Sequence, residues 1–408
     1  MIFALQAPSE KTKHIYANLF VTVMALLPLV AFFSARSMAV LPGIIAVGFF
    51  AAWPFFYKEK IQYSRFYFIC AGLLSLLCAL SALWSPDTDF AIEKSAKIAL
   101  VLLPGALLFS LAQSFRHDHV QWLRIALPAT LITSCLMIAG ELAFNLPLHR
   151  WSEGLPAYAP LTSAVVNRSL FCAGSLVVMC TMIVFSSAFS ERAKITIIAG
   201  LIASIFLALA LSQSQSNQLA IGVALLLVFA FPYKQKKVYY GLAGLMAGLI
   251  LVSPWLAQWM FQTFADPADK APWISDGYAA ERMEIWDFIS RHLVQNIWHG
   301  YGVDSTRFMT FDAAGRYYES GSVLHPHNFV LQLWGEFGVW GAVAGAAFFT
   351  FLFLRLKNIC PEKARMVLPT LAYAGIVGVI GYGMWQGWWL GQLTVIMAML
   401  GLAMRQNR

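Results

Sequence analysis

Apolar stretches of about twenty residues recur along the whole chain, separated by short polar connections. A run of this length crosses the hydrocarbon core of a bilayer as an α-helix. The pattern therefore predicts an all-α polytopic membrane protein with about twelve transmembrane helices. The expected spans are 15–33, 38–56, 66–84, 96–113, 121–145, 169–189, 193–211, 217–232, 238–260, 328–356, 367–386 and 387–404.

Composition and the placement of charge agree with this pattern. Apolar residues make up 59% of the chain and charged residues 12%, which excludes soluble multidomain enzymes, disordered tails and disulfide-framed secreted modules. If the N-terminus lies inside, every inner connection is basic, and these connections hold most of the 28 Lys and Arg residues. We therefore expect both termini in the cytoplasm, a retained first helix and, despite a net charge of +8, no nucleic-acid partner.

Two outer connections are much longer than the others, at 146–167 and 261–327. The second one divides the chain into three expected regions: transmembrane helices one to nine over 1–260, an outer loop over 261–327, and transmembrane helices ten to twelve over 328–408. In this loop the apolar positions 283, 285/286 and 289 fit a short amphipathic helix. We expect the loop to form a lid and part of an active site.

The two long outer loops retain arginine against the positive-inside bias. Arginine holds phosphate through two parallel hydrogen bonds, so an outer surface that keeps it is expected to bind an anion. Arg282 and Arg168 are the main candidates, because Arg168 stands at the mouth of an apolar span where a charge is costly. Pairing with the acids of the loop stays open as the alternative, above all for Arg291, Arg307 and Arg316.

Polar residues interrupt several of the apolar helices. Asn328, Gln332 and Glu336 are spaced i, i+4 and i+8, so they form one stripe that must face protein or water. The run 212–218 is polar throughout and is either an exposed turn or the floor of a wet cavity. Glu141, within the fifth span, is interpreted as a structural partner of an arginine or a hydroxyl, with a catalytic role as the alternative.

His327 is the candidate proton acceptor. Imidazole titrates near neutral pH, and this residue stands where an extended segment meets the start of a helix. His325 is expected to face the same side, because Pro326 keeps the segment extended. An ordinary exposed imidazole is the alternative. A His-x-His pair can bind a metal, but no further ligand cluster stands at suitable spacing, so we expect neither a metal nor another cofactor.

These residues together suit group transfer from a lipid-linked phosphate or pyrophosphate. In such a reaction an acceptor hydroxyl must lose a proton while the leaving phosphate gains charge. The histidine can accept the proton, and positioned arginines can stabilise the charge.

The stretch 325–341, HPHNFVLQLWGEFGVWG, resembles the signature of the bacterial O-antigen ligase and polymerase family. That signature has HN, then L and Q, then E-x-G-x-x-G at the outer end of a late membrane helix. Three other parts of the chain agree with the family in order and spacing: Glu281-Arg282 with Trp286, the Gly-Tyr-Gly turn at 300–302, and the segment from Ser81 to Lys97.

The resemblance implies a glycosyltransferase of the bacterial inner membrane with a periplasmic active site. Ligases of this family move O-antigen polysaccharide from undecaprenyl pyrophosphate to a sugar of the lipid A core, which completes lipopolysaccharide. The expected partners are therefore that donor, that acceptor and membrane lipids. The family histidine falls on His327 as the base, and the family arginine falls on Arg282, which holds the pyrophosphate. A single displacement without a metal would invert the anomeric carbon.

One position departs from the family pattern. Many relatives have Ser-Arg where this chain has Ser214-Gln215, and a neutral glutamine cannot hold a phosphate by charge. Either Arg168 takes that role, which we favour, or the pyrophosphate is held by one arginine fewer. His325, Asn328, Gln215, Gln332 and Glu336 are expected to support the site. An O-antigen polymerase and a protein O-oligosaccharyltransferase remain alternatives within the family, and a secondary transporter is the alternative of a different class.

Overall fold

The computed structural model describes residues 9–156, 159, 161–309, 318 and 324–406. Every regular element in these ranges is helical, which confirms the all-α prediction. The α-helices are α1 Glu10–Phe33, α2 Leu41–Phe56, α3 Arg65–Leu80, α4 Thr88–Ser114, α5 Leu123–Ala143, α6 Pro147–Ser152, α7 Asn167–Phe185, α8 Glu191–Leu211, α9 Gln215–Ala230, α10 Lys236–Lys270, α11 Pro272–Ser275, α12 Ala279–Leu293, α13 Phe329–Leu356, α14 Pro361–Ile380 and α15 Gly387–Gln406.

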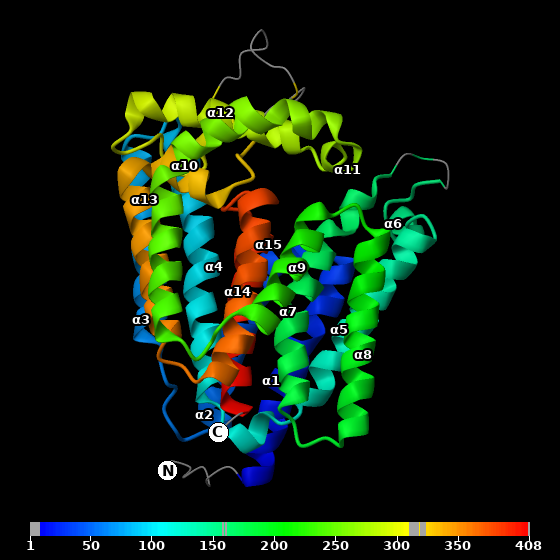
Figure 1. Ribbon diagram of the computed structural model, residues 1–408. Coiled ribbons are helices and arrows are strands. Elements are labelled where there is room, and N and C mark those ends of the chain that lie inside the picture. The colour runs from blue at the N-terminus through cyan, green and yellow to red at the C-terminus, as the bar shows by residue number, and fades with distance from the viewer. Residues whose placement is uncertain (1–8, 157–158, 160, 310–317, 319–323, 407–408) are drawn as a thin grey trace. The chain divides into compact units, whose positions relative to one another are not determined.

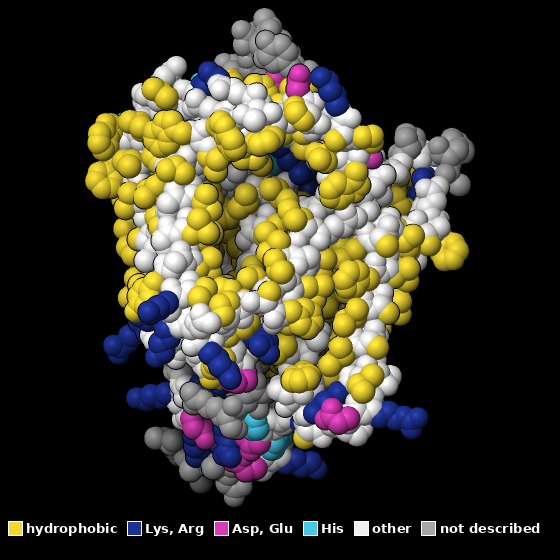
Figure 2. All heavy atoms as spheres, in the orientation of Figure 1, with side chains coloured by type: hydrophobic (Ala, Val, Ile, Leu, Met, Phe, Trp, Pro, Cys, Tyr) yellow, Lys and Arg dark blue, Asp and Glu magenta, His cyan; other side chains and the backbone are white. Residues whose placement is uncertain are grey.

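Ten helices of the described chain are long and apolar enough to cross a membrane, so the chain is a multi-pass membrane protein. The two remaining predicted spans, 38–56 and 217–232, coincide with the shorter apolar helices α2 and α9. Each has 16 residues, or about 24 Å at 1.5 Å per residue, which is less than the thickness of a typical hydrocarbon core. The number of twelve spans is therefore not confirmed. Figure 2 shows apolar side chains over the visible sides of α8 and α10, as expected of surfaces in contact with lipid.

The chain forms two compact units, each built from segments that are distant in sequence. The first unit comprises 1–72, 100–212 and 387–408. In it, α5 packs against α1, α7 and α8. Phe171 of α7 packs on Trp389 of α15 with ring centroids 4.6 Å apart, and the hydroxyl of Ser169 donates to the carbonyl of Ala31 on α1.

The second unit comprises 73–99 and 213–386. Here α10 packs along α12 and α13, and α9 packs against α14. Figure 1 shows α12 lying across the ends of α10 and α13. The indole of Trp334 on α13 donates to the carbonyl of Ile250 on α10 over 2.8 Å. Met283, Ile289 and Leu331 belong to the apolar core that these helices share.

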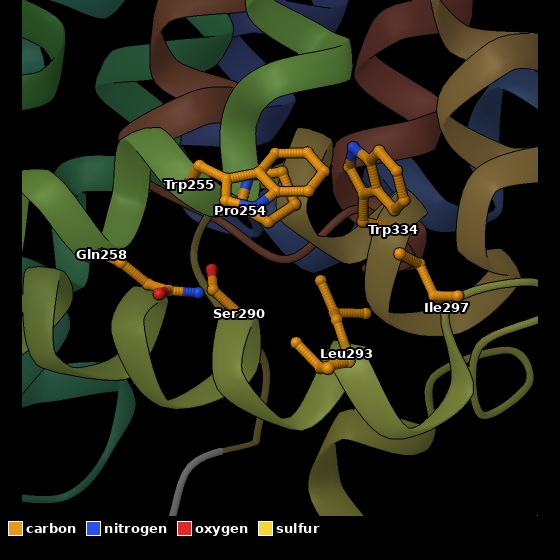
Figure 3. Close-up of a pocket in the computed structure, with 8 residues that line it drawn as sticks. Pro254, Trp255, Gln258, Ser290, Leu293, Ile297 and Trp334 are labelled. Carbon is orange, nitrogen blue, oxygen red and sulfur yellow. The ribbon is translucent and has the colours of Figure 1, made fainter.

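Helix α10 changes direction near Pro254, as Figure 3 shows. A proline within a helix removes one backbone hydrogen bond and clashes with the preceding turn, so a bend there is expected. Residues 236–254 measure about 28 Å, enough to cross a hydrocarbon core, and the rest of α10 runs beside α12. A small open pocket lies at the bend and is lined by Pro254, Trp255, Gln258, Ser290, Leu293, Val294, Ile297 and Trp334. Helix α10 ends at Lys270, so it continues past residue 261, the expected start of the outer loop.

Helix α13 is broken at Gly338, which has φ 60° and ψ −148°, a conformation that only glycine adopts without strain. The break leaves backbone groups open to other partners. The amides of Tyr301 and Gly302 donate to the carbonyls of Gly335 and Glu336 over 2.9 and 2.8 Å, and the amide of Val339 donates to the carbonyl of Ile297 over 2.8 Å. The span predicted at 328–356 therefore consists of two helical pieces with the segment 297–302 bonded at their junction.

Replacing Gly338 by alanine should destabilise the protein strongly. A Cβ there would stand 2.5 Å from the carbonyl oxygen of Ile297, in a backbone conformation that itself costs about 1–3 kcal/mol for other residues. We expect a lower midpoint of thermal unfolding in detergent. Gly375→Ala in α14 is the matched control, because a Cβ at Gly375 meets no atom within 4 Å. Equal midpoints for the two variants would contradict this account of the break.

Candidate active site

The segment from His325 to Asn328 enters α13 through a buried asparagine cap. The side chain of Asn328 accepts hydrogen bonds from the amides of Val330 and Leu331 over 3.0 and 3.2 Å, which satisfies two amides of the first turn. His327, just before this cap, has φ 53°, a left-handed conformation uncommon for a residue with a Cβ. Asn328 therefore caps α13 directly after His327, the predicted base.

The imidazole of His327 is held in one orientation by a backbone group. Its Nδ1 lies 2.9 Å from the carbonyl oxygen of Gly381, which follows the end of α14. A carbonyl oxygen can only accept, so Nδ1 carries the proton and donates it. In the neutral ring Nε2 is then the nitrogen with the lone pair, which is the form that a general base requires.

His325 packs against His327, with ring centroids 4.2 Å apart. The side-chain amide of Gln386 donates to Nε2 of His325 over 2.8 Å. Gly383 leaves room for this ring, since a Cβ there would stand 2.7 Å from it. Burial, with smaller contributions from His327, Arg307 and Lys94, lowers the pKa of His325 to about 3, so this ring stays neutral at physiological pH.

Arg282 lies on the face of α12 that meets the same segment. Trp286, one turn further along this face, donates from its indole to the carbonyl of Pro326 over 2.7 Å. Tyr382, which follows the Gly381 that binds His327, interacts electrostatically with Arg282. Burial lowers the pKa of the Arg282 guanidinium below its usual value, against the opposing effects of Tyr382 and Glu281.

No carboxylate of the described residues lies within salt-bridge distance of the Arg282 guanidinium. Arg291, on the same helix, instead pairs with Asp287 over 2.7 Å. Arg307 pairs with Asp304 over 2.6 Å, so for both residues the loop-acid alternative is confirmed. Arg316 lies outside the described residues. A partly buried cation without a carboxylate partner fits a site for an anionic ligand.

The polar stripe on α13 is satisfied by protein groups. Gln332 donates to Glu336 over 2.7 Å and accepts from the amide of Met384 over 2.8 Å. The indole of Trp385 also donates to the Glu336 carboxylate. Gln332 and Glu336 therefore fasten the segment 381–386, which contacts His327 and His325, onto α13. These contacts show that the stripe faces protein, as predicted.

Three residues of the site were not predicted as a group. The Asp304 carboxylate binds Lys94 over 2.8 Å as well as Arg307 over 2.6 Å, so two cations share one anion. Lys94 and Arg307 both affect His325, which places them near the histidine pair. The sequence had one weak signal for this, because Lys94 lies in a predicted outer connection that topology alone would keep free of lysine.

Gln215 binds another segment of the second unit, to which it belongs itself. Its side-chain amide donates to the carbonyl of Trp273, and a Cβ on Gly277 would collide with it. The polar run 212–218 lies between α8 and α9 and enters α9, where Asn217 is buried and accepts from the hydroxyl of Tyr373 over 2.9 Å. In this structure, Gln215 and Asn217 thus hold α9 against neighbouring segments.

The remaining candidates belong to the first unit. The guanidinium of Arg168 lies over the ring of Trp388 at 5.6 Å, and its role toward a pyrophosphate stays a prediction. Glu141 accepts from the amides of Leu148 and His149 and lies 2.6 Å from the His149 ring. Its partner is thus a histidine, where an arginine or a hydroxyl was expected.

Among the described residues, no third potential metal ligand joins His325 and His327.

Fold and site together define a helical multi-pass membrane protein that carries a histidine and an arginine beside a broken helix. Residues 198–346 match the family model described as O-antigen ligase. This part of the chain is therefore similar to the O-antigen ligase family. The match includes Arg282, His325, His327 and the Gly338 break.

Curated relatives support the same family at a distance. Proteins described as "putative polysaccharide ligase" from Rickettsia prowazekii (strain Madrid E) and Rickettsia typhi (strain ATCC VR-144 / Wilmington) are each 30% identical over 139 residues. One from Rickettsia conorii (strain ATCC VR-613 / Malish 7) is 26% identical over 139 residues. Each alignment covers 32% of this chain, and the chain spans about a third, 33%, of the length of each relative. No solved structure matches the chain significantly.

Proposed function

We propose that the protein is an inverting glycosyltransferase that moves O-antigen polysaccharide from undecaprenyl pyrophosphate to a sugar of the lipid A core. The hydrogen bond from Trp286 to Pro326 carries this proposal, because it sets the face of α12 that bears Arg282 against the His325–His327 segment. A proton acceptor and a cation suited to phosphate thus belong to one site. The match of 198–346 to the O-antigen ligase family supports the same reaction class.

In the proposed reaction His327 acts first on the acceptor. Its Nε2 takes the proton from the core-sugar hydroxyl while that oxygen attacks the anomeric carbon of the donor. The bond between this carbon and the pyrophosphate oxygen breaks, and undecaprenyl pyrophosphate leaves with both electrons. Arg282, helped by Arg168 as predicted from the sequence, stabilises the charge that forms on the leaving oxygen. One displacement inverts the anomeric carbon.

The proposed placement puts the protein in the bacterial inner membrane, with both termini in the cytoplasm and the site on the periplasmic face. The basic inner connections support this orientation. Twelve crossings are compatible with it if α2 and α9 cross the membrane besides the ten long helices.

Deleting the gene tests the proposed reaction against its alternatives. A ligase mutant should lack glycan on the lipid A core and accumulate long chains on the lipid carrier, with restoration by the intact gene. Accumulated single repeat units would indicate the polymerase instead. Normal lipopolysaccharide with loss of glycan from a secreted protein would indicate an O-oligosaccharyltransferase. Carrier-linked chains confined to the cytoplasmic leaflet would indicate a transporter.

A further inference from the structure

A cluster of potential metal ligands lies in the first unit, at the N-terminal end of α1. One ligand atom from each of His14, Asp118 and His119 lies within 4.8 Å of the others. His14 belongs to α1, and the other two belong to the 3-10 helix η3, His117–Val120, between α4 and α5. These residues are not used in the proposed transfer reaction.

Glu10 adds a second carboxylate to this cluster. It stands four residues before His14, so both side chains lie on one face of α1. Its Oε2 is 3.5 Å from Nε2 of His119. Glu10 thus approaches the three grouped residues at His119.

His119 presents a buried nitrogen to the cluster. Its side chain is fully buried, and its Nε2 makes no hydrogen bond of normal geometry among the described residues, with the Glu10 carboxylate 3.5 Å away. A buried polar atom in this state is destabilising unless a water or an ion satisfies it. This orphaned nitrogen is an observation independent of the grouping of the side chains.

The other nitrogen of His119 fixes the orientation of the ring. Nδ1 lies 2.6 Å from the hydroxyl of Tyr57, and this hydroxyl lies 3.3 Å from the carbonyl oxygen of Lys13. With Nδ1 held at Tyr57, Nε2 lies on the side of Glu10 and Asp118, 3.5 and 3.9 Å from their carboxylate oxygens. Histidines that ligate metals are usually oriented by such a bond at the opposite nitrogen.

We propose that Glu10, His14, Asp118 and His119 bind a divalent transition-metal ion of the zinc type. Imidazole and carboxylate ligands suit Zn²⁺ or Co²⁺, whereas Ca²⁺ and Mg²⁺ take oxygen ligands almost alone. Two carboxylates balance the two positive charges of the ion. The ion ties the start of α1 to the turn between α4 and α5.

Two cations bind the carboxylates in this structure. Lys13 lies 3.1 Å from Glu10, and Arg116 lies 3.2 Å from Asp118. The Arg116–Asp118 pair has side chains 58% and 50% exposed, and exposed pairs of this kind contribute little. A metal with four ligands binds far more strongly. Tetrahedral Zn²⁺ requires ligand atoms about 3.3 Å apart, so binding requires the exposed carboxylates to rotate toward the imidazoles.

The test uses the full-length protein, purified in detergent, stripped of metal and titrated with Co²⁺ and then Zn²⁺. We expect one Co²⁺ per chain with the visible absorption of a tetrahedral site, displaced by Zn²⁺, and a higher unfolding temperature with Zn²⁺. His14→Ala and Asp118→Asn should each weaken binding at least about 100-fold, and Tyr57→Phe by roughly 10- to 100-fold. His117→Gln, the neighbouring histidine outside the cluster, is the matched control and should bind normally.

Three results would overturn the proposal. One is the absence of the cobalt spectrum from the unaltered, folded protein. Another is equal affinity in His14→Ala and His117→Gln. A third is loss of binding in His325→Gln with retention in His14→Ala, which would assign the ion to the histidine pair of the second unit. His14 is only partly buried, so its variant should fold, and the unfolding temperature without metal checks this.

Discussion

Replacing His327 by asparagine is expected to abolish transfer of the glycan while the protein remains folded. Asparagine tolerates the left-handed backbone that His327 adopts, so the variant removes the imidazole without adding strain. The loss of a general base typically costs about 10²–10⁴-fold in rate, and donor binding should change little because His327 acts on the acceptor.

The measurement is the initial rate of transfer by purified protein supplied with lipid-linked donor and lipid A-core acceptor. His299→Asn is the matched control, since His299 contacts only its neighbour Gly300 and the Trp84 ring among the contacts described. An unchanged rate in the His327 variant, with donor and acceptor both saturating, would remove the base from the mechanism.

Replacing Arg282 by alanine should lower kcat/KM by about 10²–10³-fold, the usual effect of removing one group that stabilises a developing charge. Lysine should restore part of the activity, because it keeps the charge but loses the paired hydrogen bonds that arginine makes to phosphate. The variant should also bind undecaprenyl pyrophosphate, the product, more weakly.

Arg291→Ala provides the control on the same helix. Arg291 is paired with Asp287 and 55% exposed, so its removal should leave transfer nearly intact. Comparable losses in the two variants would mean that α12 matters through its packing and that Arg282 has no special role. Retained binding of undecaprenyl pyrophosphate by Arg282→Ala would count against a contact with the leaving group.

The helical framework was predictable because long apolar runs depend on the solvent and little on the fold around them. Each of the twelve expected spans therefore contains a helix or helices, but the helix of the span 367–386 ends at Ile380 and residues 381–386 form a turn. The ends of the helices were less predictable. Helix α10 passes position 261 and reaches Lys270, because the bend at Pro254 lets its second part pack beside α12.

The residues of the candidate site that stand in a short motif could be predicted from the sequence. Their partners from distant segments could not. His327, Arg282 and Asn328 stand in motifs that can be found by inspection of the sequence. The partners Gly381, Trp385 and Gln386 lie in a turn that has no signature of its own. Lys94 reaches Asp304 across more than two hundred residues, and such a pairing has no local pattern. The conformation of Gly338 likewise depends on the segment docked beside it.

The docking of residues 297–302 onto the broken helix has a consequence for which positions of the chain can vary. The three bonds at that junction join main-chain atoms, so they are indifferent to which side chains stand at Ile297, Tyr301 or Val339. Glycines 300, 302 and 338 are required by their positive φ, whereas other residues at positions 297, 301 and 339 keep these main-chain bonds. Substitution at these three positions can therefore change the side chains beside α13 while the backbone of the junction keeps its shape.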